Sequence, residues 1–201
     1  MVARAVVHAL RGRGAISDAQ FDRLFPVAQR ERSEVHWTPV EVARHAAAML
    51  DGAPGGEVLD VGAGVGKVCL IGALTTDLRW TGVERNPAMV RVAKRIAIAL
   101  GVERTTTFVT GDAGELDWRR FGGVYLYNPF AESVFTGAEG ADERRIAYHV
   151  EVAHIEQKLA TLRRGAGVVT FHGFGGEMPP GFELVEATPI YKDVLLHWVR
   201  R

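Results

Sequence analysis

Two short apolar runs in this chain end at acidic residues, and the first leads into closely spaced glycines. Val58-Leu59-Asp60-Val61 is followed by Gly62, Gly64 and Gly66. Glycine lets the backbone approach a ligand closely, so a strand that feeds a glycine turn and opens a helix is typical of nucleotide-binding sites. The third glycine of the dinucleotide fingerprint G-x-G-x-x-G would fall at Lys67. A carboxylate at Asp60 suits a cationic amino-acid group better than a pyrophosphate.

Two further acids follow predicted strands. Residues 79–84 read as a second strand that ends in Glu84, which lies 20 residues after Gly64. This is near the usual offset of a carboxylate that binds ribose hydroxyls. Residues 107–110 read as a third strand, and Gly111-Asp112-Ala113 follows. Asp112 is a candidate ligand contact, and it also suits the role of cap for a short segment over 113–116.

The segment after the predicted fourth strand, 121–126, reads Tyr127-Asn128-Pro129-Phe130. The amide oxygen of an asparagine can accept a hydrogen bond from an amine. The alternative is that Asn-Pro turns the chain and that Phe130 packs in the core. Both interpretations stay open at this point.

Together these segments resemble the class I S-adenosylmethionine-dependent methyltransferases, whose first motif has the form D/E-x-G-x-G-x-G. The resemblance extends over residues 38–200. It implies an α/β, Rossmann-like, doubly wound sheet of seven strands, mostly parallel with an antiparallel C-terminal strand and with helices on both faces. It also implies S-adenosyl-L-methionine as the cofactor and S-adenosyl-L-homocysteine as the product. The implied cofactor site consists of Asp60, Gly62, Ala63, Gly64, Gly66, Glu84, Arg85, Asp112, Ala113 and Asn128.

The same resemblance implies a catalytic pocket of Asn128, Pro129 and Phe130. Amino-group methyltransferases that act on adenine or glutamine carry D/N-P-P-Y/F/W here. With Asn128 in the first position, the aromatic position holds Ala131; with Phe130 as the aromatic residue, the first position holds Tyr127. Asn-x-Phe is instead similar to the non-SET lysine methyltransferases. We therefore expect methyl transfer to a nitrogen of a protein side chain or a small molecule.

Three alternatives stay open at the level of the sequence. The acceptor of the methyl group can be RNA or DNA, which would require a basic groove. The enzyme can instead transfer an aminopropyl group from decarboxylated S-adenosylmethionine. The third alternative is a cofactor-binding module without catalytic activity.

Composition narrows the class of protein. The 201 residues favour a single domain, with an N-terminal helical extension over 1–37 and a core over 38–201. The net charge is zero, so the whole chain has no strong attraction to nucleic acid, although residues 1–50 carry 7 arginines against 5 acids. One cysteine, Cys69, excludes disulfides within the chain. Because membrane-spanning and signal segments are also not apparent, we expect a cytoplasmic protein.

Periodicity and capping signals predict the elements around these residues. Predicted helices cover 15–32, with Ser17 as cap, and 38–50, 65–74, 86–100 and 141–164; predicted strands cover 58–61, 79–84, 107–110, 121–126 and 167–171. A final antiparallel pair is expected over 182–187 and 190–199, around a turn at Thr188-Pro189.

Several other residues have a functional and a structural interpretation. Trp37 can cover the cofactor pocket, with His36 beside it, or Thr38 can simply cap the next helix. His149 and His154 are five apart on a predicted helix, which does not place them on one face as a metal pair. Asn128 and Glu132 alone are too few for a metal site, so no metal is expected. His172 follows the fifth strand, where we expect a loop residue, with a role toward substrate left open.

Overall fold

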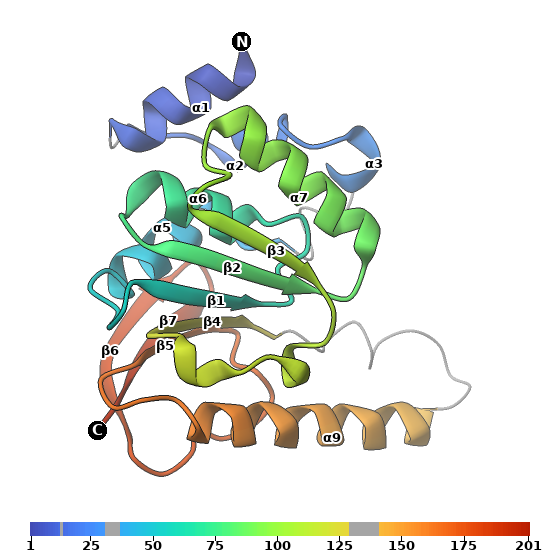
Figure 1. Cartoon of the computed structure of the whole chain (residues 1–201), viewed down its shortest axis with the longest axis vertical. Coiled ribbons are helices and arrows are strands. Elements are labelled where there is room, and N and C mark those ends of the chain that lie inside the picture. The colour runs from blue at the N-terminus through green and yellow to red at the C-terminus, as the bar shows by residue number, and fades with distance from the viewer. Residues whose placement is uncertain (13, 31–36, 129–140) are drawn as a thin grey trace.

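A seven-stranded sheet forms the centre of the molecule (Figure 1). The computed structural model describes residues 1–12, 14–30, 37–128 and 141–201. Within these residues the strands lie in the order β3-β2-β1-β4-β5-β7-β6. Their bounds are Glu57–Val61 (β1), Arg79–Glu84 (β2), Thr106–Thr110 (β3), Gly123–Tyr127 (β4), Gly167–Phe171 (β5), Phe182–Ile190 (β6) and Asp193–Arg200 (β7).

Strand direction follows the prediction. The pairs β1–β2, β1–β4, β2–β3 and β4–β5 are parallel, whereas β7 is antiparallel to both β5 and β6. The predicted Rossmann-like sheet, mostly parallel with an antiparallel C-terminal strand, is therefore confirmed. Because these strands run in the same direction, their carboxyl ends lie together at one end of the sheet.

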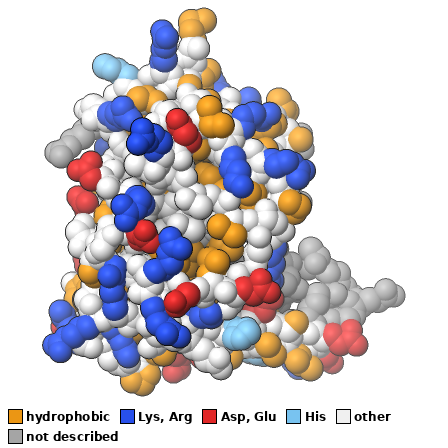
Figure 2. All heavy atoms as spheres, viewed as in Figure 1, with side chains coloured by type: hydrophobic (Ala, Val, Ile, Leu, Met, Phe, Trp, Pro, Cys, Tyr) orange, Lys and Arg blue, Asp and Glu red, His pale blue; other side chains and the backbone are white. Residues whose placement is uncertain are grey.

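Helices cover both faces of this sheet. One face packs against α5 (Val40–Met49), α6 (Lys67–Thr75) and α7 (Pro87–Leu100), with α1 (Val2–Arg11), α2 (Asp18–Asp22) and α3 (Val27–Arg30) beyond them (Figure 1). The other face packs against α9 (Ala141–Ala160) and the short 3₁₀ helices η1 (Ala113–Glu115) and η2 (Trp118–Arg120). Figure 2 shows basic side chains gathered over α7 and near α1, with few acidic side chains among them.

Strand residues alternate between the two cores. Val58 packs in the core under α5 and α6, whereas its neighbour Leu59 packs in the core against α9. The same alternation separates Val169 from Val168 in β5. Side chains with a period of two thus fill both layers, which explains why these strands read as continuous apolar runs in the sequence.

One prediction on local structure was wrong in the N-terminal region, and one helix there had no predicted bounds. The predicted helix over 15–32 is divided into α2 and α3, which a turn over 23–26 separates. Pro26 explains the break, because proline disfavours helical backbone at the residue before it and removes an N–H. The predicted cap is present: Ser17 accepts a hydrogen bond from the backbone N–H of Gln20 in a capping box. Helix α1, which had no predicted bounds, packs against α6 and α7.

The predicted turn at Thr188-Pro189 was also wrong. Strand β6 continues to Ile190, and the turn consists of residues 191 and 192, with Tyr191 at φ 53°. Pro189 is tolerated within the strand because β6 lies at the edge of the sheet, where a missing N–H breaks no ladder on the outer side. Of the described helices, none is long and apolar enough to cross a membrane.

Candidate active site

The glycine turn joins β1 to α6 and is anchored on β2. The backbone N–H groups of Gly62 and Ala63 both donate to the carbonyl oxygen of Val83, at 3.0 Å each. Gly64 has φ 56°, and a Cβ built on it would meet no atom within 4 Å. A side of the turn is therefore open at Gly64, where the backbone itself can contact a ligand.

Gly66 is required for a different reason. Its φ is 81°, and a Cβ there would lie 2.5 Å from the ring of Phe108 in β3. The backbone of the turn thus packs directly against the sheet. The two glycines therefore have different roles: Gly64 leaves space for a ligand, and Gly66 lets the helix start close to β3.

Glu84, at the end of β2, is fixed to the glycine turn. Its Oε2 accepts a hydrogen bond from the backbone N–H of Gly64 at 3.0 Å, and its Oε1 accepts one from the N–H of Asn86 at 2.8 Å. Asn86 in turn caps α7 by accepting from the N–H of Ala88. Each carboxylate oxygen keeps a further lone pair, so Glu84 can accept hydroxyl hydrogen bonds while it holds the turn.

Asp60 is buried beneath the turn. Its Oδ2 accepts a hydrogen bond from the Cys69 thiol, with a sulfur–oxygen distance of 3.5 Å. Burial raises the pKa of Asp60 to about 7, and the nearby charge of Glu84 adds to the rise. This carboxyl group can therefore gain or lose its proton near neutral pH, and a cation placed beside it would favour the ionised form.

Asp112 and Arg85 form a charged cluster at the ends of β3 and β2. Asp112 caps η1 by accepting from the N–H of Gly114 at 2.7 Å, as one interpretation of the sequence predicted. It is also ion-paired with Arg85, whose guanidinium reaches Glu151 of α9 at 2.7 Å. Burial opposes ionisation of Asp112, but the Gly114 N–H and Arg85 outweigh it and lower the pKa.

The ends of β4 and β5 lie side by side. Asn128 has φ 31°, and its N–H donates to the carbonyl oxygen of Gly173 at 2.9 Å. His172 has φ 55°; its Nδ1 pairs with the carboxylate of Asp193, and its ring packs on Tyr127 with centroids 5.4 Å apart. Two non-glycine residues with positive φ at one sheet edge are uncommon, and such backbone clusters at functional sites.

The structure places four of the predicted site residues at one end of the sheet, and two others lie outside the described residues. Because β1 to β5 are parallel, Asp60, Glu84, Asp112 and Asn128 all lie at or near the carboxyl ends of strands on one sheet edge. Pro129 and Phe130 lie outside the described residues, as does His36. Among the residues that are described, no group of three or more His, Cys, Asp or Glu side chains could hold a metal ion.

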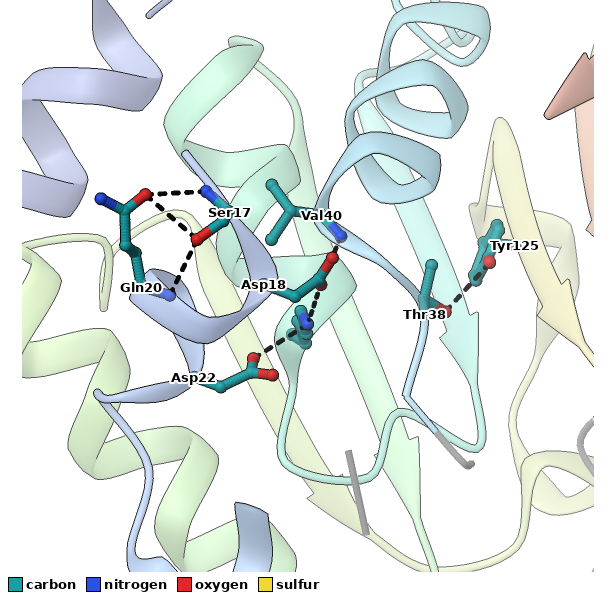
Figure 3. Close-up of polar contacts among 8 residues, drawn as sticks. Ser17, Asp18, Gln20, Asp22, Thr38, Val40 and Tyr125 are labelled. Carbon is teal, nitrogen blue, oxygen red and sulfur yellow. Dashed lines mark hydrogen bonds and ion pairs between the residues drawn. The ribbon is translucent and has the colours of Figure 1, made fainter. Parts of the chain in front are cut away.

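An ionic contact that sequence reasoning missed ties the N-terminal region to the glycine turn (Figure 3). Lys67, the first residue of α6, is buried, and its Nζ lies 2.6 Å from Asp18 Oδ1 and 2.9 Å from Asp22 Oδ1. The rings of Phe21 and Trp37 flank the ammonium at 5.8 and 5.7 Å. A lysine directly after the last glycine of the turn, within an otherwise apolar run, was the available signal for a buried cation.

Asp18 also accounts for the start of α5. Thr38 was one candidate for its cap, and this was wrong: the cap residue is Pro39, and Asp18 accepts the hydrogen bond from the N–H of Val40 at 2.8 Å. Thr38 instead lies 3.1 Å from the Tyr125 hydroxyl of β4 (Figure 3). Asp18 therefore joins α2, α5 and α6 through one carboxylate oxygen.

Sequence comparison with curated proteins gives similarity over a local stretch. No protein-family model matches the chain. Over 61 residues, 30% of this chain, it is 36% identical to ajmaline N-methyltransferase of Rauvolfia serpentina. The match spans only 21% of that enzyme's length.

Solved structures share the fold over most of the chain. An RNA methyltransferase from Salinibacter ruber, crystallised with S-adenosyl-L-homocysteine, superposes with a TM-score of 0.57 at 22% identity, over 81% of this chain and 92% of that one. TrmN from Thermus thermophilus gives a TM-score of 0.61 at 18% identity, over 90% of this chain and 53% of that one. Together with the strand order and the glycine turn, these similarities show that the chain has the Rossmann-like fold of the class I S-adenosylmethionine-dependent methyltransferases.

Proposed function

We propose that this protein is a methyltransferase that uses S-adenosyl-L-methionine and methylates a nitrogen of a protein side chain or a small molecule. The observation that carries the proposal is the contact between Glu84 and the N–H of Gly64. It joins the two sequence motifs into one rigid edge, with an open backbone surface at Gly64 and free lone pairs on the carboxylate. Such an edge suits a nucleoside with an amino-acid tail.

The residues present fit that cofactor. In this proposal Glu84 accepts from the ribose hydroxyls, and Asp60 supports the ammonium of the amino-acid end, directly or through water. Ala63 and Gly64 offer backbone next to the ligand. Asp112 and Ala113 receive the adenine, with Arg85 holding Asp112 in place through their ion pair.

The acceptor side is proposed at the ends of β4 and β5. When bound, the cofactor supplies a methyl group already activated by a sulfonium. The protein then contributes alignment and desolvation. Asn128 is proposed to accept a hydrogen bond from the acceptor N–H through its amide oxygen, which directs the nitrogen lone pair. Half-buried Tyr127, together with Pro129 and Phe130, would favour the uncharged amine by excluding water.

Calorimetric binding tests the cofactor site. Wild-type protein should bind S-adenosylmethionine and S-adenosylhomocysteine but not NAD or ATP. Glu84→Gln should weaken both at least tenfold, because hydrogen bonds to a charged group contribute roughly 1.5–3 kcal/mol. Glu103→Gln, an exposed acid on the loop before β3, is the matched control. Absence of binding, or a preference for NAD, would sink the proposal.

Methyl transfer from isotopically labelled cofactor tests the acceptor side. Asn128→Gly keeps the backbone free to adopt φ 31° and removes only the amide. We expect it to lose most of its transfer to amine or protein acceptors at saturating cofactor, with any change in cofactor binding measured separately by calorimetry. Unchanged transfer by Asn128→Gly would contradict the role given to Asn128, and labelling of nucleic acid alone would contradict the proposed acceptor class.

A further inference from the structure

The chain is neutral as a whole, but in two neighbouring helices every ionisable side chain is basic. Helix α1 carries Arg4, His8 and Arg11, and α7 carries Arg91, Lys94 and Arg95. Neither helix contains an acidic residue. The upper part of the face in Figure 2 displays this gathering of basic side chains over α7 and near α1. Charge is thus segregated in a way that the net value of zero conceals.

A groove lies between these two helices. It has a volume of about 730 Å³ and is lined on one side by Arg4, His8 and Arg11 of α1. Ile98 and Gly101, at the end of α7, line the other side. The three α1 residues are spaced i, i+4 and i+7, so they form one row along that helix.

The groove is continuous with the basic surface of α7. Arg91, Lys94, Arg95 and Ile98 are all exposed and occupy one arc of the helix, since residues three, four and seven apart share a face. Ile98 also lines the groove. The basic track, defined here as Arg4, His8, Arg11, Arg91, Lys94 and Arg95, therefore extends from the groove toward the start of α7 at Pro87, three residues after Glu84.

The charges of the basic track are available to a ligand. Within the described part of the chain, the ion pairs formed by arginine and lysine involve Lys67, Arg79, Arg85, Arg119, Arg120, Arg145 and Arg201, and none involves a residue of the track. Surface cations that form no ion pair with a described residue raise the local concentration of anions. The ligand should therefore be a polyanion with several regularly spaced charges.

We propose that the basic track binds the phosphate backbone of a single-stranded nucleic acid. Side chains three or four apart on a helix lie roughly 5–6 Å from one another, which lets successive phosphates meet successive cations. Arginine binds phosphate oxygens through two parallel N–H groups. The groove has the size of a site for one small ligand, so it accommodates one strand rather than a duplex. Its apolar residues, Ile98 among them, can contact the bases.

A membrane surface fits less well. Membrane-bound amphipathic helices present a face of large apolar residues to the lipid. Apart from Met1 just before α1, the exposed large apolar side chains of these two helices are Val2 and Ile98, one on each helix, which is too few for such a face. The observations therefore favour a nucleic acid over an anionic lipid.

Fluorescence anisotropy without any cofactor tests the proposal independently of methyl transfer. The probes are labelled RNA and DNA strands of about 12 nucleotides, the corresponding duplexes, and vesicles that contain phosphatidylserine. Wild-type protein should bind a single strand of RNA or DNA with an affinity that falls with salt, by a log–log slope of about −0.7 for each phosphate contacted. Comparison of the affinities for the RNA and DNA strands shows which of the two nucleic acids the protein binds.

Charge-reversal variants locate the site. Arg91→Glu/Arg95→Glu and Arg4→Glu/Arg11→Glu should each weaken single-strand binding at least tenfold and reduce the salt slope by about 1.4, which corresponds to two lost contacts. Arg145→Glu, on the exposed surface of α9, is the matched control and should have little effect. Circular dichroism and thermal unfolding confirm that each variant folds. Absence of strand binding, tighter binding of duplex or vesicles, or equal loss in Arg145→Glu would overturn the proposal.

Discussion

Replacing Lys67 by methionine should destabilise the protein and loosen its N-terminal region. The ammonium of Lys67 is held between Asp18 and Asp22, and the side chain is only 5% exposed. Methionine has a similar length and no charge, so the cavity stays filled while the ionic contact is removed. The two carboxylates then remain close together without the cation between them.

The size of the effect follows from the exposure of the two acids. Removing one partner of a buried ion pair typically costs about 3–5 kcal/mol, because the other charge stays buried. The side chain of Asp22 is 7% exposed, whereas that of Asp18 is 43% exposed and reaches water. Solvent screening therefore reduces the share of Asp18. We expect a loss of roughly 2–3 kcal/mol for Lys67→Met, below the usual cost because Asp18 reaches water and Asp22 has a further interaction.

Urea denaturation measures this loss of stability, in the wild type and in a variant whose two aspartates are replaced by asparagine. Lys67→Met in an Asp18→Asn/Asp22→Asn background should be much less damaging than in the wild type, because no buried charge remains. Lys192→Met, on the exposed turn between β6 and β7, is the control and should change stability by less than about 0.5 kcal/mol. A loss below about 1 kcal/mol for Lys67→Met, or the same loss in both backgrounds, would refute the reasoning.

Further predictions concern the glycine turn and its buried acid. The pKa of Asp60 is raised from 3.8 to about 7 in the folded protein. The stability that this group contributes to the ligand-free protein is therefore present below about pH 4 and is lost as the pH rises toward 7. Denaturation at a series of pH values should show this decline, and Asp60→Asn should flatten it. A cationic ligand favours the ionised carboxylate of Asp60. Calorimetry should therefore find that the affinity for S-adenosylmethionine rises by up to roughly tenfold per pH unit between pH 5 and 7 and then levels off. An affinity of the wild type that does not change with pH would contradict a role for Asp60. Gly66→Ala should lose roughly 2–5 kcal/mol of stability, from positive φ and from overlap with Phe108, measured by thermal unfolding. Gly64→Ala should lose less stability but more cofactor affinity, since its Cβ enters open space; the reverse order for the two glycines would show that the turn is assigned wrongly.

The sequence alone predicted the elements that local patterns define. Strands β2 and β5 have the predicted bounds, because an apolar run bounded by turn residues determines both the face and the length of a buried strand. The positions of Glu84 and Asp112 at strand ends followed from the same patterns, since parallel strands end at one edge. Their roles toward a ligand stay predictions.

Long-range contacts could not be predicted in this way. Lys67 and Asp18 are 49 residues apart, and no periodicity connects them. The same holds for the cap that Asp18 provides to α5, which replaced the local candidate Thr38. Pro189 misled for a related reason: proline ends a central strand but is tolerated at an edge, and only the complete strand order shows that β6 is an edge.

The place of β7 in the sheet has a consequence for how the protein folds. β7 pairs with β5 on one side and with β6 on the other, although β6 precedes it in the chain. β6 therefore has no neighbour in the sheet until β7 has been synthesised, and it can join the sheet only together with β7 or after it. Until β7 docks, β5 keeps an unpaired edge, which is the kind of transient surface that favours misassembly in nascent chains. The parallel part of the sheet, and with it the site at the ends of β1 to β4, can form before this final docking step.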